Sequence, residues 1–525
     1  MTTRMTAYRP RVEAGRDGFA QLLWAEWTKF RTVRAWLITL AASAVLIVLL
    51  AFVSASGSPA RFCPGPSAAT CTTNLPTVAT GPGGEAVADI YMYVHRPLAG
   101  DGTITARVTS LVGRQAAAVP PTSQPAQIQS GLAPWAKAGL LVEPDTSQGV
   151  AYAAVLVTGA HGVQMQYNYT HDMAGLPGSV GPSSPRWLRL TRTGDLITGY
   201  DSSDGKHWTQ IGTIRLTGLP PTVQVGLFVT SPVIFAPGAS NGNPSVATAS
   251  FAQVSTQGDL PHRSWTGEPI GAGSFYPYLP GASTWRQQSG GAFTVSGSGD
   301  VAPLVGGGVI ANNAGASILT GGIAGLLVLI VLATLFVTSE YRRGLIATTF
   351  VANPRRGRVL AAKAVVIGSV AFVAGAIGTA IAMLISRHVL TVNGNYLFPA
   401  SGPTLARAIV GTGVVLGLAA MLVLALGTML RRSAGAVMAG IVVLVLPFVL
   451  EKALPSGAAN WLVRLTPAAA FAMQDIQPHS ALVANVYSPI NAYFPLSPWA
   501  GLAVLCGYTA VALAGAMWLL RRRDV

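Results

Sequence analysis

Charged side chains are scarce in this sequence. Only 10% of its 525 residues are Asp, Glu, Lys or Arg, and half of all residues are hydrophobic. A soluble domain carries about 25% charged residues. The composition therefore excludes an ordinary soluble protein and indicates an integral membrane protein, long enough for more than one domain.

Acidic residues are the scarcer charged kind, 19 against 34 Lys and Arg, which gives a formal net charge of +15. Residues 56–314 hold 12 bases and 12 acids, so the whole excess lies in the two apolar parts of the chain. Most of those bases stand beside long uncharged runs, as expected for loops kept on the cytoplasmic side of a membrane. We interpret the charge as a topology signal and expect no nucleic-acid partner.

Cysteine is also rare, with three in the chain. Cys63 and Cys71 flank a short Pro/Gly/Ala stretch just after the first apolar run. If this region is exported, they can form a local disulfide; the alternative is two free thiols. Cys506 stands alone in an apolar run, and we expect it to pack as a small hydrophobe.

Several chemical motifs are missing. The sequence has no GxxxxGK[ST] phosphate loop, so this chain cannot hold ATP by that route, and it has neither HExxH nor GxSxG. Its long apolar runs contain no Asp, Glu, Lys, Arg or His, which argues against a proton relay or a charged channel ring. We expect no catalytic residue, no metal site and no cofactor on this chain.

What is present is a set of six uncharged apolar runs, each close to the roughly 20 residues that cross a bilayer as a helix. They cover residues 35–53, 317–338, 364–386, 408–430, 433–450 and 499–520. The arginine clusters all fall on one side if both termini, including the tail at 1–18, are cytoplasmic. Residues 56–314 are then extracellular, as is the partly apolar segment 451–498. The expected fold class is a polytopic α-helical membrane protein of six spans with a large inserted ectodomain.

Residues 19–34 predict an amphipathic helix lying in the headgroup plane. One face of the helical wheel collects its apolar residues: Phe19, Leu22, Leu23, Trp27, Phe30 and Val33. Glu26 falls within this apolar face. It can pair with Lys29, one turn further on, or contact a partner.

Residues 56–314 predict an all-β sandwich. Short segments rich in β-forming residues recur at regular spacing, separated by turn signals such as Ser203-Asp204-Gly205. They are residues 90–94, 103–108, 138–142, 151–156, 164–169, 187–191, 196–200, 209–214, 223–229, 249–254 and 292–296.

The loop at 339–363 is strongly basic. It holds five arginines and Lys363 against a single acid, Glu340. Residues 340–352 can form a helix with Leu345, Ile346, Thr349 and Phe350 near one face, ended by Asn353-Pro354. The loop is either a topology anchor or a docking element for a cytoplasmic partner.

Two stretches resemble permease subunits of actinobacterial type-2 ABC exporters. One is Ala25-Glu26-Trp27-Thr28-Lys29 with Arg31 and Arg34. The other comprises Glu340-Tyr341-Arg342, Gly344, Thr348-Thr349, Pro354-Arg355 and Arg358 through Lys363.

The resemblance implies a coupling helix in this loop, seated against a separate ATPase that binds ATP and magnesium. The coupling residues would be Glu340, Arg342, Arg343, Gly344, Phe350, Pro354, Arg355 and Arg358. Those of the first, interfacial helix would be Glu26, Trp27, Lys29 and Arg31. The outer segment 451–498 would dip back into the membrane. The insertion of some 260 residues after the first span departs from the family pattern.

The insert itself resembles a concanavalin-like jelly-roll domain through residues 135–142, 186–190, 204–208 and 223–231. Such domains often bind sugars through aromatic residues. The candidates are Trp135, Tyr167, Tyr169, Trp187 and Trp208; the alternative, that they pack in the core or at strand edges, is the more common role of such residues.

These patterns favour the permease subunit of an ABC exporter, working as a homodimer or a paired permease. The alternative is a membrane-anchored cell-surface carbohydrate-binding or sensor protein, for which one or two spans would suffice. A membrane enzyme acting on lipid-linked sugars is disfavoured because the apolar runs lack acids.

Overall fold

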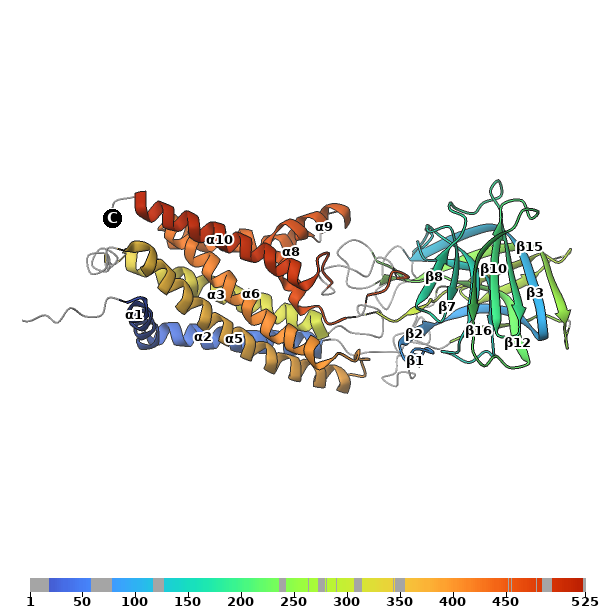
Figure 1. Ribbon diagram of the computed structural model, residues 1–525, viewed down its shortest axis with the longest axis horizontal. Helices are drawn as coiled ribbons and strands as arrows, with labels where there is room; N and C mark the ends of the chain where they lie inside the picture. The colour runs from blue at the N-terminus through green and yellow to red at the C-terminus, as the bar shows by residue number, and fades with distance from the viewer. Residues whose placement is uncertain are drawn as a thin grey trace, which may run out of the picture.

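A helical bundle and a β domain lie at opposite ends of the molecule in the computed structural model (Figure 1). The structure describes residues 18–57, 78–116, 127–235, 242–262, 264–271, 279, 281–288, 290–305, 314–342, 344, 355–451, 453–454, 456–477, 479–483 and 493–522. Cys63, Cys71, Arg343, Phe350 and Pro354 lie outside these residues, so the disulfide and most of the predicted coupling helix are not described.

Five of the described helices are long and apolar enough to cross a membrane. They are α2 (Arg34–Ser56), α3 (Ala314–Arg342), α5 (Arg356–Val392), α6 (Gly402–Leu430) and α10 (Pro498–Arg522). Each contains one of the predicted spans. The helices extend beyond the uncharged runs because Arg, Lys and His side chains at the ends can reach the headgroup region.

The predicted span at 433–450 is different. It consists of α7 (Ser433–Leu444) and α8 (Leu446–Glu451), separated at Val445. Pro447 has no N–H for a helical hydrogen bond, and its ring clashes with the carbonyl four residues earlier, which breaks the helix there. The structure therefore shows five long apolar helices and a broken pair rather than six uninterrupted ones.

Small residues set the packing of the bundle. A Cβ atom on Gly321 of α3 would lie 2.3 Å from the carbonyl oxygen of Ile47 on α2, so only glycine permits this approach. Buried Ile, Leu, Val, Phe and Ala side chains of α2, α3, α5 and α6 form the core. Cys506 is exposed on α10 rather than packed in that core, which corrects the sequence expectation. At α6, the predicted tight turn is present, with Arg431 in the left-handed region at φ 55°.

The segment after α8 holds α9 (Ser456–Leu465) and a 3₁₀ helix, η2 (Pro467–Gln474). Every residue of η2 is buried, and it packs against α10. A Cβ atom on Gly501 of α10 would lie 2.1 Å from the carbonyl oxygen of Ala469 in η2. The apolar residues of η2 are therefore buried within the chain, whereas Trp461 and Leu465 of α9 are 61% and 63% exposed.

The β domain is built around one long strand, β3 (Tyr91–Ala116). Its nine-strand main path has the order β11-β10-β9-β3-β12-β5-β6-β7-β8, and β15, β16 and β4 also pair with β3. The sheet curls until β11 contacts β7 and β8, which gives a sandwich-like, nearly closed barrel with one apolar core inside. The bounds are β4 (Ile128–Ser130), β5 (Lys137–Glu143), β6 (Ala153–Thr158), β7 (Val163–Tyr167), β8 (His171–Ala174), β9 (Arg186–Thr193), β10 (Leu196–Ser202), β11 (Thr209–Arg215), β12 (Thr222–Thr230), β15 (Ser245–Asp259), β16 (Thr266–Ile270), β17 (Thr284–Gln287) and β18 (Phe293–Gly297).

Every predicted strand segment overlaps one of these strands. The first two, at 90–94 and 103–108, both belong to β3, which continues past Gly100 at φ 63°. Glycine adopts this conformation without steric cost, so the strand bends there and does not end. The sequence pattern predicts two separate strands here, whereas the structure has one strand that bends at Gly100.

A small three-stranded sheet lies at the bundle-facing end of the β domain (Figure 1). It contains β1 (Ala79–Thr80), β2 (Ala86–Asp89) and β19 (Val301–Pro303). Because Val301 pairs with Asp89 and Pro303 with Val87, the chain enters and leaves the β domain side by side.

Candidate functional site

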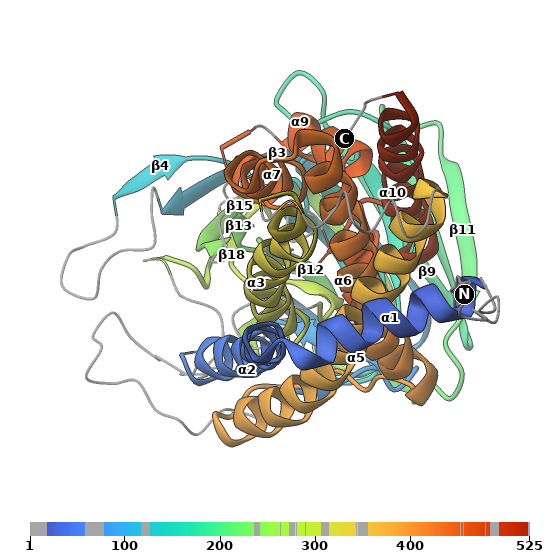
Figure 2. The same cartoon turned by 90° about the vertical axis from the view of Figure 1, so that its left-hand side faces the viewer.

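The helix α1 (Phe19–Thr32) lies across the end of the bundle farthest from the β domain (Figure 2). Val33 has an extended conformation, and this single residue turns the chain into α2. Phe30 is fully buried and meets the ring of Phe336 on α3 edge-on at 5.9 Å. Trp24 and Trp27 remain partly exposed, at 65% and 39%. Residues 19–32 thus form the predicted helix, and Leu22, Leu23 and Phe30 of its predicted apolar face pack against the bundle.

Four charged side chains meet beneath α1. Lys363 of α5 places its Nζ 2.7 Å from Glu26 Oε2 and 2.6 Å from Glu340 Oε1. Lys29 Nζ lies 2.8 Å from Glu26 Oε1 and 3.4 Å from Glu340 Oε1. We call Glu26, Lys29, Glu340 and Lys363 the ion cluster; it joins α1, the end of α3 and the start of α5.

Three of the four side chains in the ion cluster are buried, and only Lys29 is substantially exposed. The side chain of Lys363 is 2% exposed, that of Glu26 3% and that of Glu340 9%, whereas Lys29 is 41% exposed. Two carboxylates and two ammonium groups compensate each other's charge, which offsets the cost of removing them from water. The ring of Phe336 lies 5.1 Å from Lys363 Nζ and adds a cation–π contact. The arrangement fixes the three helices relative to one another.

The local pair of Glu26 with Lys29 was one of the two alternatives that the sequence left open, and it is present. The bond from Lys363 was missed. Lys363 was counted among the topology charges, although it stands directly before an uncharged run and Glu340 directly after one. Two opposite charges at facing ends of neighbouring spans are the signal that could have found it.

Other predicted coupling residues surround this site. Arg342 is the last residue of α3, and Gly344 follows at φ 67°, a left-handed turn position. Arg355 precedes α5, and Arg358 is exposed on its first turn. Arg31 on α1 places its guanidinium carbon 5.7 Å from the ring centre of Trp24, instead of joining the ion cluster.

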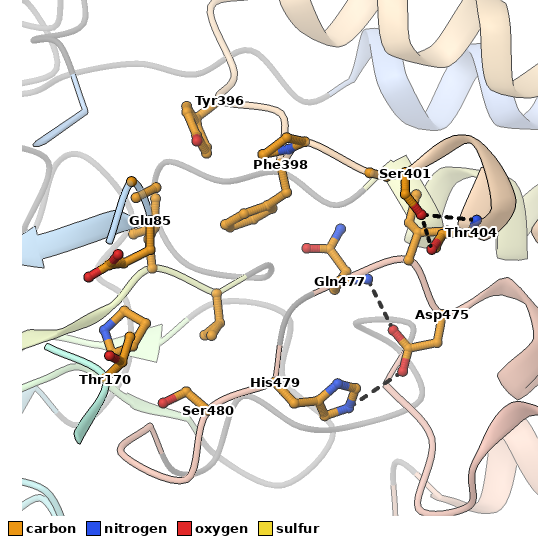
Figure 3. A pocket seen from close by; sticks show the side chains of 18 of the residues that line it. Glu85, Thr170, Tyr396, Phe398, Ser401, Thr404, Asp475, Gln477, His479 and Ser480 are labelled. Atoms are coloured by element: carbon orange, nitrogen blue, oxygen red, sulfur yellow. Dashed lines mark hydrogen bonds and ion pairs between the residues drawn. The ribbon is translucent and has the colours of Figure 1, made fainter. Parts of the chain in front are cut away.

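A second candidate site is a pocket of about 640 Å³ between the β domain and the bundle (Figure 3). We call it the juxtamembrane pocket. One wall is largely apolar, with Tyr396, Phe398 and Leu304. Glu85 and Thr170 line it from the β domain. The pocket therefore offers both apolar surface and polar groups where the two parts of the chain meet.

Its polar end lies on the bundle side. Asp475 accepts from the backbone N–H of Gln477 at 3.2 Å, and its Oδ2 is 3.4 Å from His479 Nε2 (Figure 3). Arg407 donates to the backbone carbonyl of Asp475. Burial raises the pKa of Asp475, while the charges of His479 and Arg407 act in the opposite direction. The described residues hold no group of three or more His, Cys, Asp or Glu that could bind a metal ion.

The five aromatic candidates of the β domain do not form one surface. Trp135 and Tyr169 are buried at 5% and 1% exposure. Trp135 stacks on His161, and Tyr167, half-buried, stacks on His171.

Trp187 and Trp208 are half-buried, and arginines lie over both rings. Arg189 is 3.8 Å from the ring centre of Trp208, and Arg107 is 6.0 Å from that of Trp187. A sugar stacking on Trp208 would have to displace Arg189 from that ring face.

Comparison with known proteins identifies no family. No family model matches the chain, and no curated protein matches it. The solved structures found include scytalido-glutamic peptidase with a transition-state analogue (TM-score 0.25, 10% identity), for which the match covers 40% of this chain and 99% of that one. A functionally unknown protein from Saccharomyces cerevisiae has TM-score 0.23 and 14% identity, over 35% and 84% of the two chains. A mutant GH43 protein from Bacillus licheniformis has TM-score 0.17 and 14% identity, over 25% and 24%. Likenesses this weak carry no argument about function.

Proposed function

We propose that this chain is the permease subunit of an ABC exporter, driven by a separate ATPase that binds ATP and magnesium. The observation that carries the proposal is the ion cluster. It ties α1 to the two helices on either side of the basic loop, α3 and α5. A force applied to the loop would reach these three helices together, since buried ion pairs hold the helix ends nearest the loop to one another.

In this mechanism the chain supplies no chemistry. Closure of the ATPase would push the loop between Arg342 and Arg355, and the helices would move as rigid bodies. The basic side chains of the loop suit a groove lined with acids, which sets orientation, and Phe350 supplies an apolar anchor. The juxtamembrane pocket would receive the exported molecule at the other end of the bundle.

The proposed topology has both termini inside and the β domain outside, with α7 and α8 together making the sixth crossing. One chain would form half of a two-fold transporter, as homodimer or paired permease. A single cysteine at Ser203 tests the orientation in a variant whose three native cysteines are replaced by alanine. Ser203 is exposed, whereas neighbouring Ser202 is buried and its Oγ accepts from Gly205 N in the turn. Labelling only after permeabilisation would contradict this topology.

The coupling function is tested with Phe350→Ala in the full chain. Truncating a buried interface aromatic costs roughly 2 kcal/mol or more. We expect weaker copurification of the ATPase, or ATP hydrolysis that no longer responds to transport, with normal membrane insertion. The matched control is Phe52→Ala on α2, a phenylalanine that is 44% exposed and lies outside both the loop and the juxtamembrane pocket.

Two results would count against the proposal. One is that no ATP-hydrolysing partner copurifies with the parent chain from its native cells. The other is that Phe350→Ala binds and stimulates the ATPase as the parent does, which would leave the loop as a topology anchor.

A further inference from the structure

A cavity of about 640 Å³ lies between the start of α5 and the end of α10, at the end of the bundle where α1 lies. Four arginines and no acidic residue line it. Its lining residues are Arg355, Arg356, Gly357, Arg358, Ala361, Met517 and Arg521. We call it the arginine cavity.

One arginine holds the cavity together. Arg356 Nη1 donates to the carbonyl oxygen of Leu520 at 2.9 Å, which satisfies one of the last carbonyls of α10 and fixes the two helices to each other. Arg358 and Arg521 are exposed. Both guanidinium groups line this one cavity, and among the residues that the structure describes no carboxylate pairs with either of them.

The cavity is amphipathic along the bundle axis. Ala361 lies one turn into α5 from Arg358, and Met517 lies one turn into α10 from Arg521, so the arginines stand at the helix ends above an apolar floor. Beside them, Trp518 is 52% exposed, and the guanidinium carbon of Arg522 lies 4.3 Å from its ring centre. Tryptophan at this depth is typical of a membrane–water interface.

We propose that the arginine cavity binds the phosphate group of an anionic phospholipid. Planar guanidinium groups bind phosphate in bidentate fashion. Basic pockets between helix ends on the cytoplasmic side suit anionic headgroups. The apolar floor gives the acyl chains of a lipid a surface to pack on, which a free phosphate would not use. The proposal rests on the proposed topology, which places this end of the bundle at the cytoplasmic leaflet, but it needs no ATPase, so its test is separate from that of the transport function.

The test uses the full chain, purified in detergent and stripped of lipid. Phosphatidylglycerol or phosphatidylcholine is added in steps, and bound lipid is counted by native mass spectrometry. We expect the parent to retain phosphatidylglycerol in preference to phosphatidylcholine. Each arginine near an anionic lipid contributes about fivefold in affinity. Arg358→Gln with Arg521→Gln should therefore weaken phosphatidylglycerol binding about 25-fold.

Two controls keep the test decisive. Arg432→Gln removes the same charge from an exposed arginine in the turn between α6 and α7, outside the cavity, and should change binding less than twofold. The single variant Arg521→Gln should lose about fivefold in affinity, between the parent and the double variant. Such a graded loss indicates lost contacts to the lipid, whereas a misfolded variant would lose lipid binding altogether. Neither variant touches Arg356, which holds the helices together.

Inorganic phosphate distinguishes the two sources of the phosphate group. Retention of phosphatidylglycerol in the presence of millimolar phosphate supports a lipid site. Full displacement by phosphate at that concentration overturns it in favour of a free-anion site. Unchanged lipid binding by the double variant, or equal loss in Arg432→Gln, also overturns the proposal.

Discussion

Replacing Lys363 with Met removes the cation that contacts both buried carboxylates of the ion cluster, while most of the apolar stem volume is kept. Glu26 and Glu340 then face each other with only the half-exposed Lys29 near them. Removing one partner of a buried ion pair costs about 3–5 kcal/mol. Because Lys29 remains, we expect a loss of stability at the lower end of this range, about 3 kcal/mol. With a melting shift of about 2–4 °C per kcal/mol, the bundle should unfold roughly 6–12 °C earlier.

The assay is thermal unfolding of the purified chain in detergent, followed by tryptophan fluorescence and circular dichroism. Lys29→Met is the matched control, since an exposed ion pair contributes at most about 1 kcal/mol. The triple variant Glu26→Gln, Glu340→Gln and Lys363→Met removes every buried charge of the ion cluster, and it should recover most of the lost stability. Equal melting of Lys29→Met and Lys363→Met, or a triple variant no better than the single one, would refute the reasoning.

Three further predictions concern other parts of the chain. Gly501→Ala should destabilise the bundle by about 1–3 kcal/mol, because its new Cβ would overlap the η2 backbone. Gly507→Ala on the same helix has open space and should be neutral, and thermal melts of the two variants test the difference in stability. Lys137→Met should destabilise the β domain by about 3–5 kcal/mol, since Lys137 Nζ lies 3.0 Å from the buried Asp300; adding Asp300→Leu should restore much of it in the same unfolding measurement. Burial raises the pKa of Asp89 to about 6, so the folded β domain binds this proton more tightly than the unfolded chain does. Its stability should therefore fall by about 3 kcal/mol as the pH rises from about 3 to about 7, most steeply between about 4 and 6, and Asp89→Asn should flatten that part of the measured curve.

Local patterns predicted the elements of this fold well. Uncharged runs mark the long helices, and alternating segments mark the strands, because both periods follow directly from backbone geometry. The failures have local causes as well. Pro447 was read as lying near the end of a span, yet it splits that span into α7 and α8. Residues 90–94 and 103–108 are predicted as two strands, yet both belong to β3, which bends at Gly100.

The candidate sites were harder to predict, because residues far apart in the sequence build them. Glu26 and Lys363 are 337 positions apart, so no helical wheel brings them together. The arginine cavity lies between the start of α5 and the last turn of α10. In the sequence, the arginines at each of these helix ends indicate only which side of the membrane the end lies on. For the β domain, the sequence could name aromatic residues but not that Arg189 lies over Trp208.

The separation of Glu26 and Lys363 also has a consequence for biosynthesis. At about 5–20 residues per second, the ribosome reaches Lys363 roughly 20–70 s after Glu26. The whole β domain is translated in that interval. During it, Lys29 is the only member of the ion cluster already made that can neutralise Glu26, three positions away on the same helix. Lys29 is thus a temporary partner for Glu26 in the nascent chain, and α1 and α2 rely on this local pair until α3 and α5 bring Glu340 and Lys363.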